Sequence, residues 1–277
     1  MKIVTDSSAN LDHLAHTDFA AVPIRIRIGD REYRDTPELD ADAMMRDMTA
    51  CTESTGTACP SVGDWLRAFG EDDSIVAAVL TSKLSGCYNG AAAAAEEYMD
   101  AHPGRRVVLL DTLTTGPAME LIAEKGDELH QTGMPFDELC GALRAYVRRT
   151  RLAFMLGSLN NFARNGRVSP ALAKLVSMLK IRIVGRASDD GDLEPLNKCR
   201  GEKNAVEQIW SNMRRAGYNG GKVRIRHTDN RRAAEALRQL IAEKHPLSDV
   251  RIAVNRGLCS YYAERGGLLV GFEGGAS

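Results

Sequence analysis

Hydroxyl-bearing and glycine-bearing segments follow several apolar runs of this chain, and residues of these types could bind an anion. The segments are Thr5 to Ser8, Thr81 to Gly86, Asp111 with Thr112, and Asn165 to Arg167. In an open α/β sheet, the loops at the carboxyl ends of parallel strands line one crevice, and ligands bind there. Hydroxyls, free N–H groups at helix starts and one arginine are suited to a small anion. The pattern therefore predicts anion binding before catalysis.

The elements that must position these segments alternate in the first half of the chain. We expect strands at residues 1–6, 75–80 and 107–110, and helices that start near Ser61, after Ser85, near Pro117 and near Pro135. Ser61 and Asp64 form a capping box at the start of the first of these helices. Alternating strands and helices predict a parallel sheet covered by helices.

The pattern changes after Thr150. We expect strands at 153–156, 180–187, 223–226, 250–254 and 268–272, and helices at 170–179, 202–215 and 231–244, with a hairpin turn at 189–192. We therefore predict an α/β protein of two domains. Residues 1–150 would form an N-terminal domain with a parallel sheet, and residues 151–277 a C-terminal α+β domain.

Composition excludes several functions. The 277 residues carry a formal net charge of -1, which gives no electrostatic reason to expect nucleic acid as a partner. No apolar run approaches the length of a membrane span, and the first apolar stretch is too short for a signal peptide. We expect a cytoplasmic protein without stable membrane insertion. Its six cysteines are widely spaced and are expected to be reduced, and the close pair His13 and His16 lacks a third ligand, so no metal or cofactor is expected.

Several motifs, in order, resemble those of the DegV family of fatty-acid-binding proteins. Residues 57–63 (TACPSVG) resemble the family's Thr-Ser-Gln-Pro-Ser-Pro-Gly, and residues 81–89 (TSKLSGCYN) resemble its Ser-Ser-x-Leu-Ser-Gly-Thr-Tyr-Gln. Further matches are Thr5 to Ser8, Tyr33 to Asp35, Arg164 to Ser169, Asp190-Gly191 with Arg200, and Arg226 to Asn230. The resemblance covers nearly the whole chain, and the ordered set is more specific than any single tetrapeptide.

The resemblance implies that a long acyl chain is buried between two domains, with its carboxylate held by Thr57 and Ser85. A carboxylate only accepts hydrogen bonds and suits two hydroxyl donors, although both residues could instead cap helices. Arg167 would lie close to the carboxyl end, or else form a surface or interdomain ion pair. His227, in another matching motif, is expected to be structural. We expect aliphatic and methionine side chains to enclose the acyl chain.

One departure from the family concerns residues 260–266 (SYYAERG). Relatives that present fatty acid to a kinase carry Gly-Thr-His-Thr-Gly-Pro-Gly there, so Tyr262 replaces the histidine and Arg265 the proline. Tyrosine is neutral near pH 7, whereas histidine exchanges a proton there. We therefore expect fatty-acid binding that does not involve this loop, together with poor transfer to a kinase. Cys87 also replaces the threonine of the second motif.

The function predicted from the sequence is to bind a long-chain fatty acid in an interdomain tunnel, without catalysis. The first alternative is a carrier subunit whose bound acid a separate fatty-acid kinase phosphorylates. The second alternative is an enzyme that acts on a small anionic metabolite in the same crevice. No nucleophile and base stand at a diagnostic spacing for that alternative.

Overall fold

The computed structural model describes residues 1–179 and 181–275, and its N-terminal half is built on a parallel sheet. Sheet A has the strand order β2-β1-β6-β7, and all its pairs are parallel. Its strands are β1 (Lys2–Asp6), β2 (Asp18–Val22), β6 (Ser74–Val79) and β7 (Arg106–Asp111). This confirms the predicted parallel sheet, with β2 as a strand that the sequence analysis missed.

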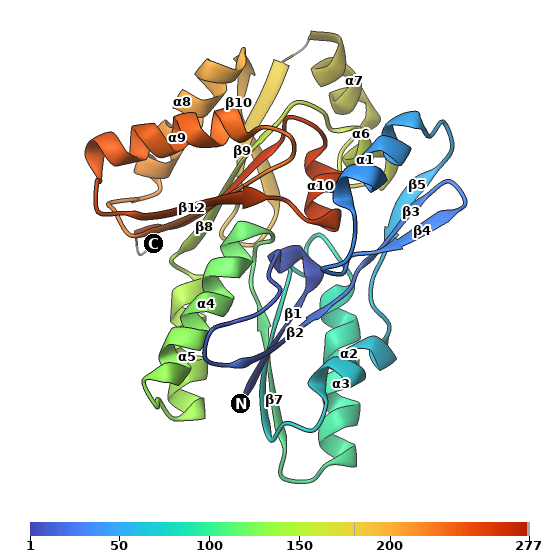
Figure 1. Ribbon diagram of the computed structural model, residues 1–277, viewed down its shortest axis with the longest axis vertical. Coiled ribbons are helices and arrows are strands. Elements are labelled where there is room, and N and C mark those ends of the chain that lie inside the picture. Colours follow the sequence, from blue (N-terminus) through green and yellow to red (C-terminus); the bar gives the residue numbers. More distant parts are fainter. Residues whose placement is uncertain (180, 276–277) are drawn as a thin grey trace.

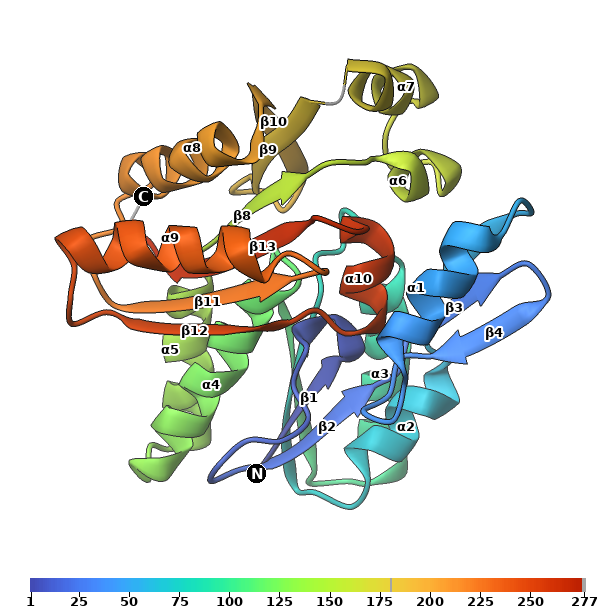
Figure 2. The ribbon, with the colours of Figure 1, turned by 45° about the horizontal axis from the view of Figure 1, so that its top comes forward.

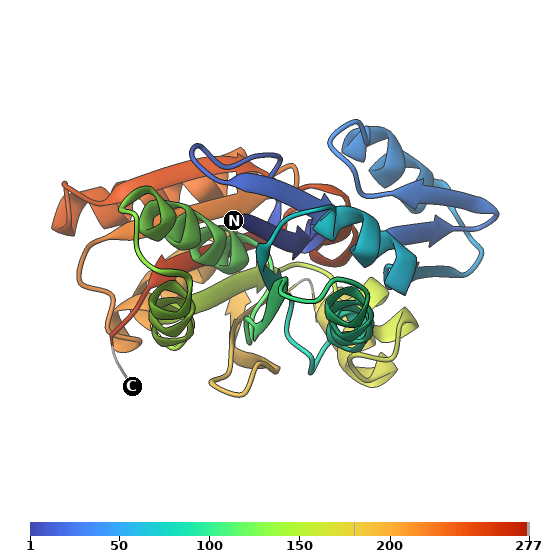
Figure 3. The same ribbon diagram turned by 90° about the horizontal axis from the view of Figure 1, so that it is seen from below.

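Helices cover both faces of sheet A, as Figure 3 shows from below. The helices are α2 (Val62–Phe69), α3 (Cys87–Ala101), α4 (Pro117–Gln131) and α5 (Phe136–Val147). Along β1, Val4 belongs to the core shared with α2 and α3, whereas Ile3 belongs to the core shared with α4 and α5. This alternation follows from the two-residue period of a strand. The predicted capping box is confirmed, because the Ser61 hydroxyl and the Asp64 carboxylate each accept the other residue's N–H.

A small antiparallel sheet lies beside sheet A, in a region where the sequence analysis placed no element (Figure 1). Sheet B has the order β4-β3-β5, and the helix α1 accompanies it. The elements are β3 (Arg25–Ile28), β4 (Arg31–Arg34), α1 (Ala41–Ala50) and β5 (Thr55–Ala58). The signal was present in β3, where buried isoleucines alternate with arginines, but the strands are only four residues long.

The second half forms the mixed sheet C, of order β10-β9-β8-β13-β11-β12. Its strands are β8 (Thr150–Leu156), β9 (Ile181–Ala187), β10 (Leu193–Arg200), β11 (Lys222–His227), β12 (Asp249–Val254) and β13 (Leu268–Glu273). The strands predicted here are confirmed within a few residues, except that Lys180 lies outside the described residues. The predicted hairpin joins β9 to β10, which pair antiparallel.

Further helices belong to the second half of the chain. They are α6 (Asn160–Arg164), α7 (Pro170–Leu179), α8 (Glu202–Arg215), α9 (Arg231–Lys244) and α10 (Gly257–Ala263). Helices α8 and α9 pack on one side of sheet C and α4 on the other (Figure 2). Strand β8 serves both sides, because Ala153 and Met155 join the core under α8 and α9 while Phe154 joins the opposite core. Among the described helices, none has the length and apolar character needed to cross a membrane.

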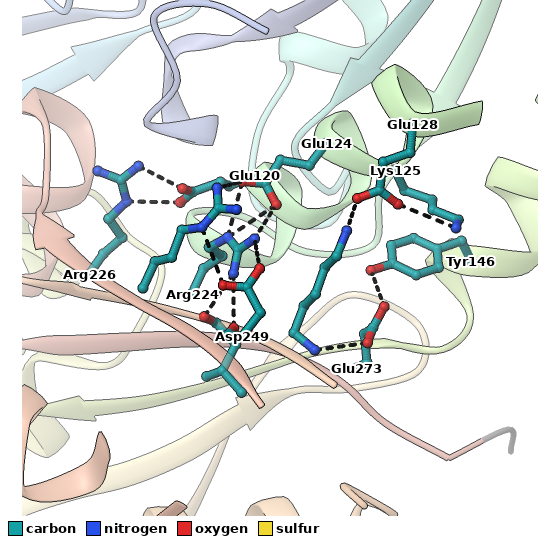
Figure 4. A network of polar contacts seen from close by, with 12 residues as sticks. Glu120, Glu124, Lys125, Glu128, Tyr146, Arg224, Arg226, Asp249 and Glu273 are labelled. Atoms are coloured by element: carbon teal, nitrogen blue, oxygen red, sulfur yellow. Dashed lines mark hydrogen bonds and ion pairs between the residues drawn. The ribbon is translucent and has the colours of Figure 1, made fainter. Parts of the chain in front are cut away.

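Helix α4 connects the two halves through a row of ion pairs (Figure 4). Lys222 pairs with Glu128, Arg224 with Glu124, and Arg226 with Glu120. Residues four apart on a helix are separated by about 6 Å, and residues two apart on a strand by about 6.6 Å. The two rows of charges therefore match in spacing. The Arg224 side chain is only 1% exposed and also pairs with Asp249 at 2.9 Å, so the buried charge is compensated by two carboxylates.

The strands of sheets A and B all precede Thr150, and those of sheet C begin there or later. The proposed domain boundary near Thr150 agrees with this change of sheet. Helix α10 nevertheless packs against α1, β3 and the 3-10 turn η1 (Ser7–Ala9), so the C-terminal half also contributes to the N-terminal core. We therefore keep 1–150 and 151–277 as a proposal for the domains.

The tip of the β9–β10 hairpin packs against the loop that follows β6. This contact predicts that a side chain at Gly191 would destabilise the protein. Gly191 has φ +92°, and a Cβ there would lie 2.2 Å from Thr81 Oγ1. We expect Gly191→Ala to lower the free energy of unfolding by about 1–3 kcal/mol, measured by urea denaturation. Gly104→Ala is the matched control, because Gly104 has φ +95° but nothing within 4 Å of its added Cβ. Equal losses in the two variants would contradict the contact.

Candidate functional site

A cavity lies between the elements of the two halves. Its volume is about 780 Å³ when the open space at its mouth is included. Leucine and phenylalanine are prominent among the residues of its walls: Leu80, Leu84, Leu152, Phe154, Leu156, Phe162, Leu193, Leu258 and Leu269. No methionine lines the cavity among the described residues, so the expectation of methionine side chains around the acyl chain is wrong. Met44, Met45 and Met48 on α1 instead pack inside the N-terminal core.

Three polar residues predicted from the sequence line this same cavity: Thr57, Ser85 and Arg167. Thr57 lies on β5, Ser85 just before α3, and Arg167 in the turn after α6. The fold therefore brings together side chains that are up to 110 residues apart in the numbering of the chain. Their roles toward a ligand stay a prediction, because the structure contains none.

The other predicted anion-binding segments do not line the cavity. Asp6 is buried and accepts the N–H groups of Leu80 (2.7 Å) and Ser8 (3.0 Å). The Ser7 hydroxyl accepts the N–H of Ile24 at 3.1 Å. The segment Thr5 to Ser8 therefore holds neighbouring loops in place. The prediction that it binds the anion directly is wrong.

Ser85 both lines the cavity and contacts the first residue of a helix. Its hydroxyl accepts the N–H of Cys87, the first residue of α3, at 3.3 Å. The same oxygen lies 3.1 Å from the Cys87 sulfur and 3.3 Å from the Cys59 sulfur. The N-cap of α3 is Gly86, without a side-chain cap, so the capping alternative is not confirmed for Ser85; its hydroxyl nevertheless lies at the positive end of α3.

Thr57 contacts Tyr262, which the sequence analysis kept apart from binding. The two hydroxyl oxygens are 2.9 Å apart, and Tyr262 also lines the cavity. The expectation that the site would not involve residues 260–266 is therefore wrong. Residues 260–263 belong to α10, which presents Tyr261 to Thr55 (2.8 Å) and Tyr262 to Thr57. Alternate residues of a strand share one face, so two consecutive tyrosines reach two threonines of β5.

Helix α10 begins where the Asp35 carboxylate accepts the N–H groups of Gly257 (2.9 Å) and Leu258 (3.0 Å). These bonds satisfy two donors at the helix start and fix the orientation of α10. Burial raises the pKa of Asp35, and it is also the largest cause that raises the pKa of Tyr262. The Tyr262 hydroxyl is therefore neutral near pH 7, as the sequence predicted.

Arg167 is held by carbonyls. Its Nε donates to Leu84 O (3.2 Å) and its Nη1 to Asn165 O (2.9 Å), while its guanidinium lies 5.6 Å from the centre of the Tyr262 ring. The ion pair proposed as an alternative is not found among the described residues. The charge beside the cavity is thus not neutralised by a protein carboxylate there.

Two other predicted residues lie away from the cavity. His227 is buried and accepts the N–H of Asn230 at 3.3 Å, which confirms a structural role. Arg265, which replaces the proline of the family pattern, donates to Asp229 at 2.8 Å and does not line the cavity. No sequence pattern indicated that Cys59 would join the site, although it stands inside the motif at 57–63.

Known proteins resemble this chain in sequence and in fold. The family model described as "Uncharacterised protein, DegV family" matches residues 1–272. The chain belongs to the DegV family. A DegV domain-containing protein of Streptococcus pneumoniae strain R6 is 38% identical over 276 residues, which cover 98% of each chain.

Two solved structures resemble this DegV chain over 99% of both chains, each with a TM-score of 0.96. One is a DegV family protein from Eubacterium eligens loaded with heptadecanoic acid, 38% identical. The other is the Streptococcus pneumoniae Fatty Acid Kinase (Fak) B3 protein loaded with linoleic acid, 37% identical. The fold is therefore the two-domain α/β fold of the family.

Asp6, in the first DegV motif, predicts a measurable dependence of stability on pH. Burial raises the pKa of Asp6 from 3.8 to about 6. The folded protein then binds a proton more tightly than the unfolded chain between these values, so stability falls as pH rises from about 4 to 6. Asn does not titrate. Over this pH window we therefore expect the unfolding free energy of the wild type to fall by about 3 kcal/mol relative to that of Asp6→Asn. Denaturation curves at several pH values check it, and a constant difference would contradict it.

Proposed function

We propose that this protein binds a long-chain fatty acid in the cavity, with the carboxylate held by Thr57 and Ser85 and with Arg167 close to it. The single observation that carries the proposal is an apolar cavity with two hydroxyls and an arginine without a carboxylate partner at its wall. The relatives loaded with heptadecanoic and linoleic acid support it, because they share both the fold and more than a third of the sequence.

The walls suit the acyl chain. Each buried CH₂ group contributes about 0.8 kcal/mol, so a chain of many methylenes can bind tightly without any chemistry. Leucine side chains on β8, β10 and β13 supply this surface from the C-terminal half, and Leu80 and Leu84 supply it from the N-terminal half. A small polar metabolite would gain nothing from such walls. The proposed function is therefore binding, and it requires no catalytic residue.

The polar residues suit the carboxylate. Hydroxyl donors and the amino end of α3 stabilise a negative charge, and the Arg167 charge adds long-range attraction. A cytoplasmic location is part of the proposal, supported by the six free cysteines of the structure, since disulfides are rare in that compartment.

Native mass spectrometry of the purified protein tests the proposal. We expect a co-purifying mass that corresponds to one long-chain fatty acid and that disappears after delipidation. Addition of oleic acid to the delipidated protein should restore a one-to-one complex, whereas butyric acid should not. A protein that carries no acyl-sized mass and takes up no oleic acid would contradict the proposal.

A second candidate function is to present the bound acid to a fatty-acid kinase. The observation that favours it is the relative named as a Fatty Acid Kinase B3 protein, 37% identical. The carboxyl end must then be reachable and its charge balanced as phosphate arrives. In this chain the neutral Tyr262 stands where a histidine was expected from the family pattern.

We predict slow formation of acyl phosphate when lipid-loaded protein is mixed with such a kinase and ATP. Tyr262→His should raise the rate about tenfold or more, because a residue that exchanges protons near pH 7 is restored. Tyr262→Phe is the matched control, since it removes the hydroxyl without adding an imidazole. If the histidine variant is no faster than the wild type, the role assigned to position 262 is wrong.

A further inference from the structure

Two cysteines of this chain meet at the polar part of the cavity. Cys59 and Cys87 both line it, and Ser85 Oγ lies within 3.3 Å of one sulfur and 3.1 Å of the other. A Cβ placed on Gly86 would lie 3.8 Å from the Cys59 sulfur, so this sulfur rests against the loop that leads into Cys87. The two thiols are 28 positions apart in the sequence and come from different elements. Their meeting is a property of the fold.

Both positions also depart from the family motifs quoted above. Cys59 stands where the first motif has glutamine, and Cys87 where the second has threonine.

The two thiols differ in the way that a redox pair requires. Cys59 is exposed to solvent, whereas Cys87 is buried. A hydrogen bond from Cys87 is the largest cause that lowers the pKa of Cys59 to about 6, with further contributions from Ser85 and Arg167. The Cys59 thiolate is therefore the accessible nucleophile. The same hydrogen bond, burial and the Asp6 charge raise the pKa of Cys87; the first cause disappears once Cys59 loses its negative charge by oxidation, while the other two remain.

We propose that Cys59 and Cys87 form a reversible disulfide under peroxide, and that this bond disrupts the carboxylate site and releases the fatty acid. In the first step, the Cys59 thiolate attacks one peroxide oxygen, becomes a sulfenic acid and releases hydroxide. Cys87 then gives up its proton and attacks the sulfenic sulfur, and a second hydroxide leaves as the S–S bond forms. Overall the two thiols lose two electrons and two protons, and hydrogen peroxide becomes two molecules of water.

The consequence for the ligand rests on the function proposed above. The Ser85 hydroxyl contacts both sulfurs, so an S–S bond that draws them together removes these thiol contacts and changes the surroundings of the hydroxyl. Ser85 is also the proposed carboxylate donor, and its hydroxyl accepts the N–H of Cys87. Oxidation should therefore weaken fatty-acid binding about tenfold or more, and a thiol reductant should restore it.

The test uses delipidated, fully reduced protein treated with one to two equivalents of hydrogen peroxide. Peptide mapping after alkylation should find residues 59 and 87 cross-linked in the wild type, and titration with oleic acid should show the weaker binding. Cys59→Ser and Cys87→Thr should form no cross-link, and the Cys87→Thr protein should instead yield a Cys59 sulfenic acid that dimedone traps. Cys51→Ser is the matched control, because Cys51 is partly exposed but lies off the cavity and should leave the cross-link intact.

The outcomes separate the two proposals. If the wild type forms no 59–87 cross-link, the redox pair is wrong whatever the ligand. If the cross-link forms but the affinity for oleic acid is unchanged, control of binding by the pair is wrong. If the reduced protein does not bind oleic acid at all, the proposed function fails, while the cross-link still reports on the thiols.

Discussion

Leu193→Trp is expected to abolish tight fatty-acid binding while the protein still folds. Leu193 lies on β10, is half-buried and lines the cavity, so a larger ring there occupies space needed by the acyl chain. Exclusion of about four methylenes would cost about 3 kcal/mol, or roughly a 100-fold rise in Kd. Isothermal titration of the delipidated variant with oleic acid measures the effect.

Leu196→Trp is the matched control for this substitution. Leu196 lies on the same strand but is 45% exposed and is not among the residues that line the cavity. Its affinity for oleic acid should stay within about twofold of the wild type, and both variants should give native circular dichroism. Equal affinities in the two tryptophan variants would place the acyl chain elsewhere.

The second large effect on affinity is expected from substitutions at the carboxylate end of the ligand. Ser85→Ala and Thr57→Ala each remove a hydroxyl donor, and a hydrogen bond to a charged group contributes about 1.5–3 kcal/mol. We expect Kd for oleic acid to rise about 10-fold to 150-fold in each variant. Oleyl alcohol carries no charge, so the same substitutions should change its affinity much less. The ratio of the two affinities therefore reports on the carboxylate contact.

Stability must be followed in these variants, because the Ser85 hydroxyl also accepts the N–H of Cys87 at the start of α3. Ser82→Ala is the matched control, since Ser82 is exposed in the same loop and does not line the cavity. If Ser85→Ala lowered the affinities for oleic acid and oleyl alcohol equally, Ser85 would act through the fold of the loop and not on the carboxylate.

Local patterns predicted much of the fold. A few neighbouring residues are enough to predict such patterns. The structure contains the capping box at Ser61 and Asp64, the apolar strands of sheet A and the turn around Gly191. Sheet B and α1 were missed because their strands are short and their burial depends on contact with α10. The matching charges on α4 and β11 stand at regular spacings, but nothing local indicates that a helix and a strand about 100 residues apart will meet.

The same limit applies to the site. The family pattern indicated Thr57, Ser85 and Arg167, and the structure places all three at one cavity. The contact between Thr57 and Tyr262 joins residues 205 positions apart, so no local signal predicted it. The meeting of Cys59 with Cys87 likewise depends on how β5 and the start of α3 pack together.

The most direct test of the account is a crystal structure of the delipidated protein after addition of stearic acid. The account predicts continuous density for an acyl chain along the cavity, past Leu193 and Phe154, with the carboxylate within hydrogen-bond distance of Thr57 Oγ1 and Ser85 Oγ. Density for the acid at any other surface, or with its carboxylate at the opposite end of the cavity, would contradict it.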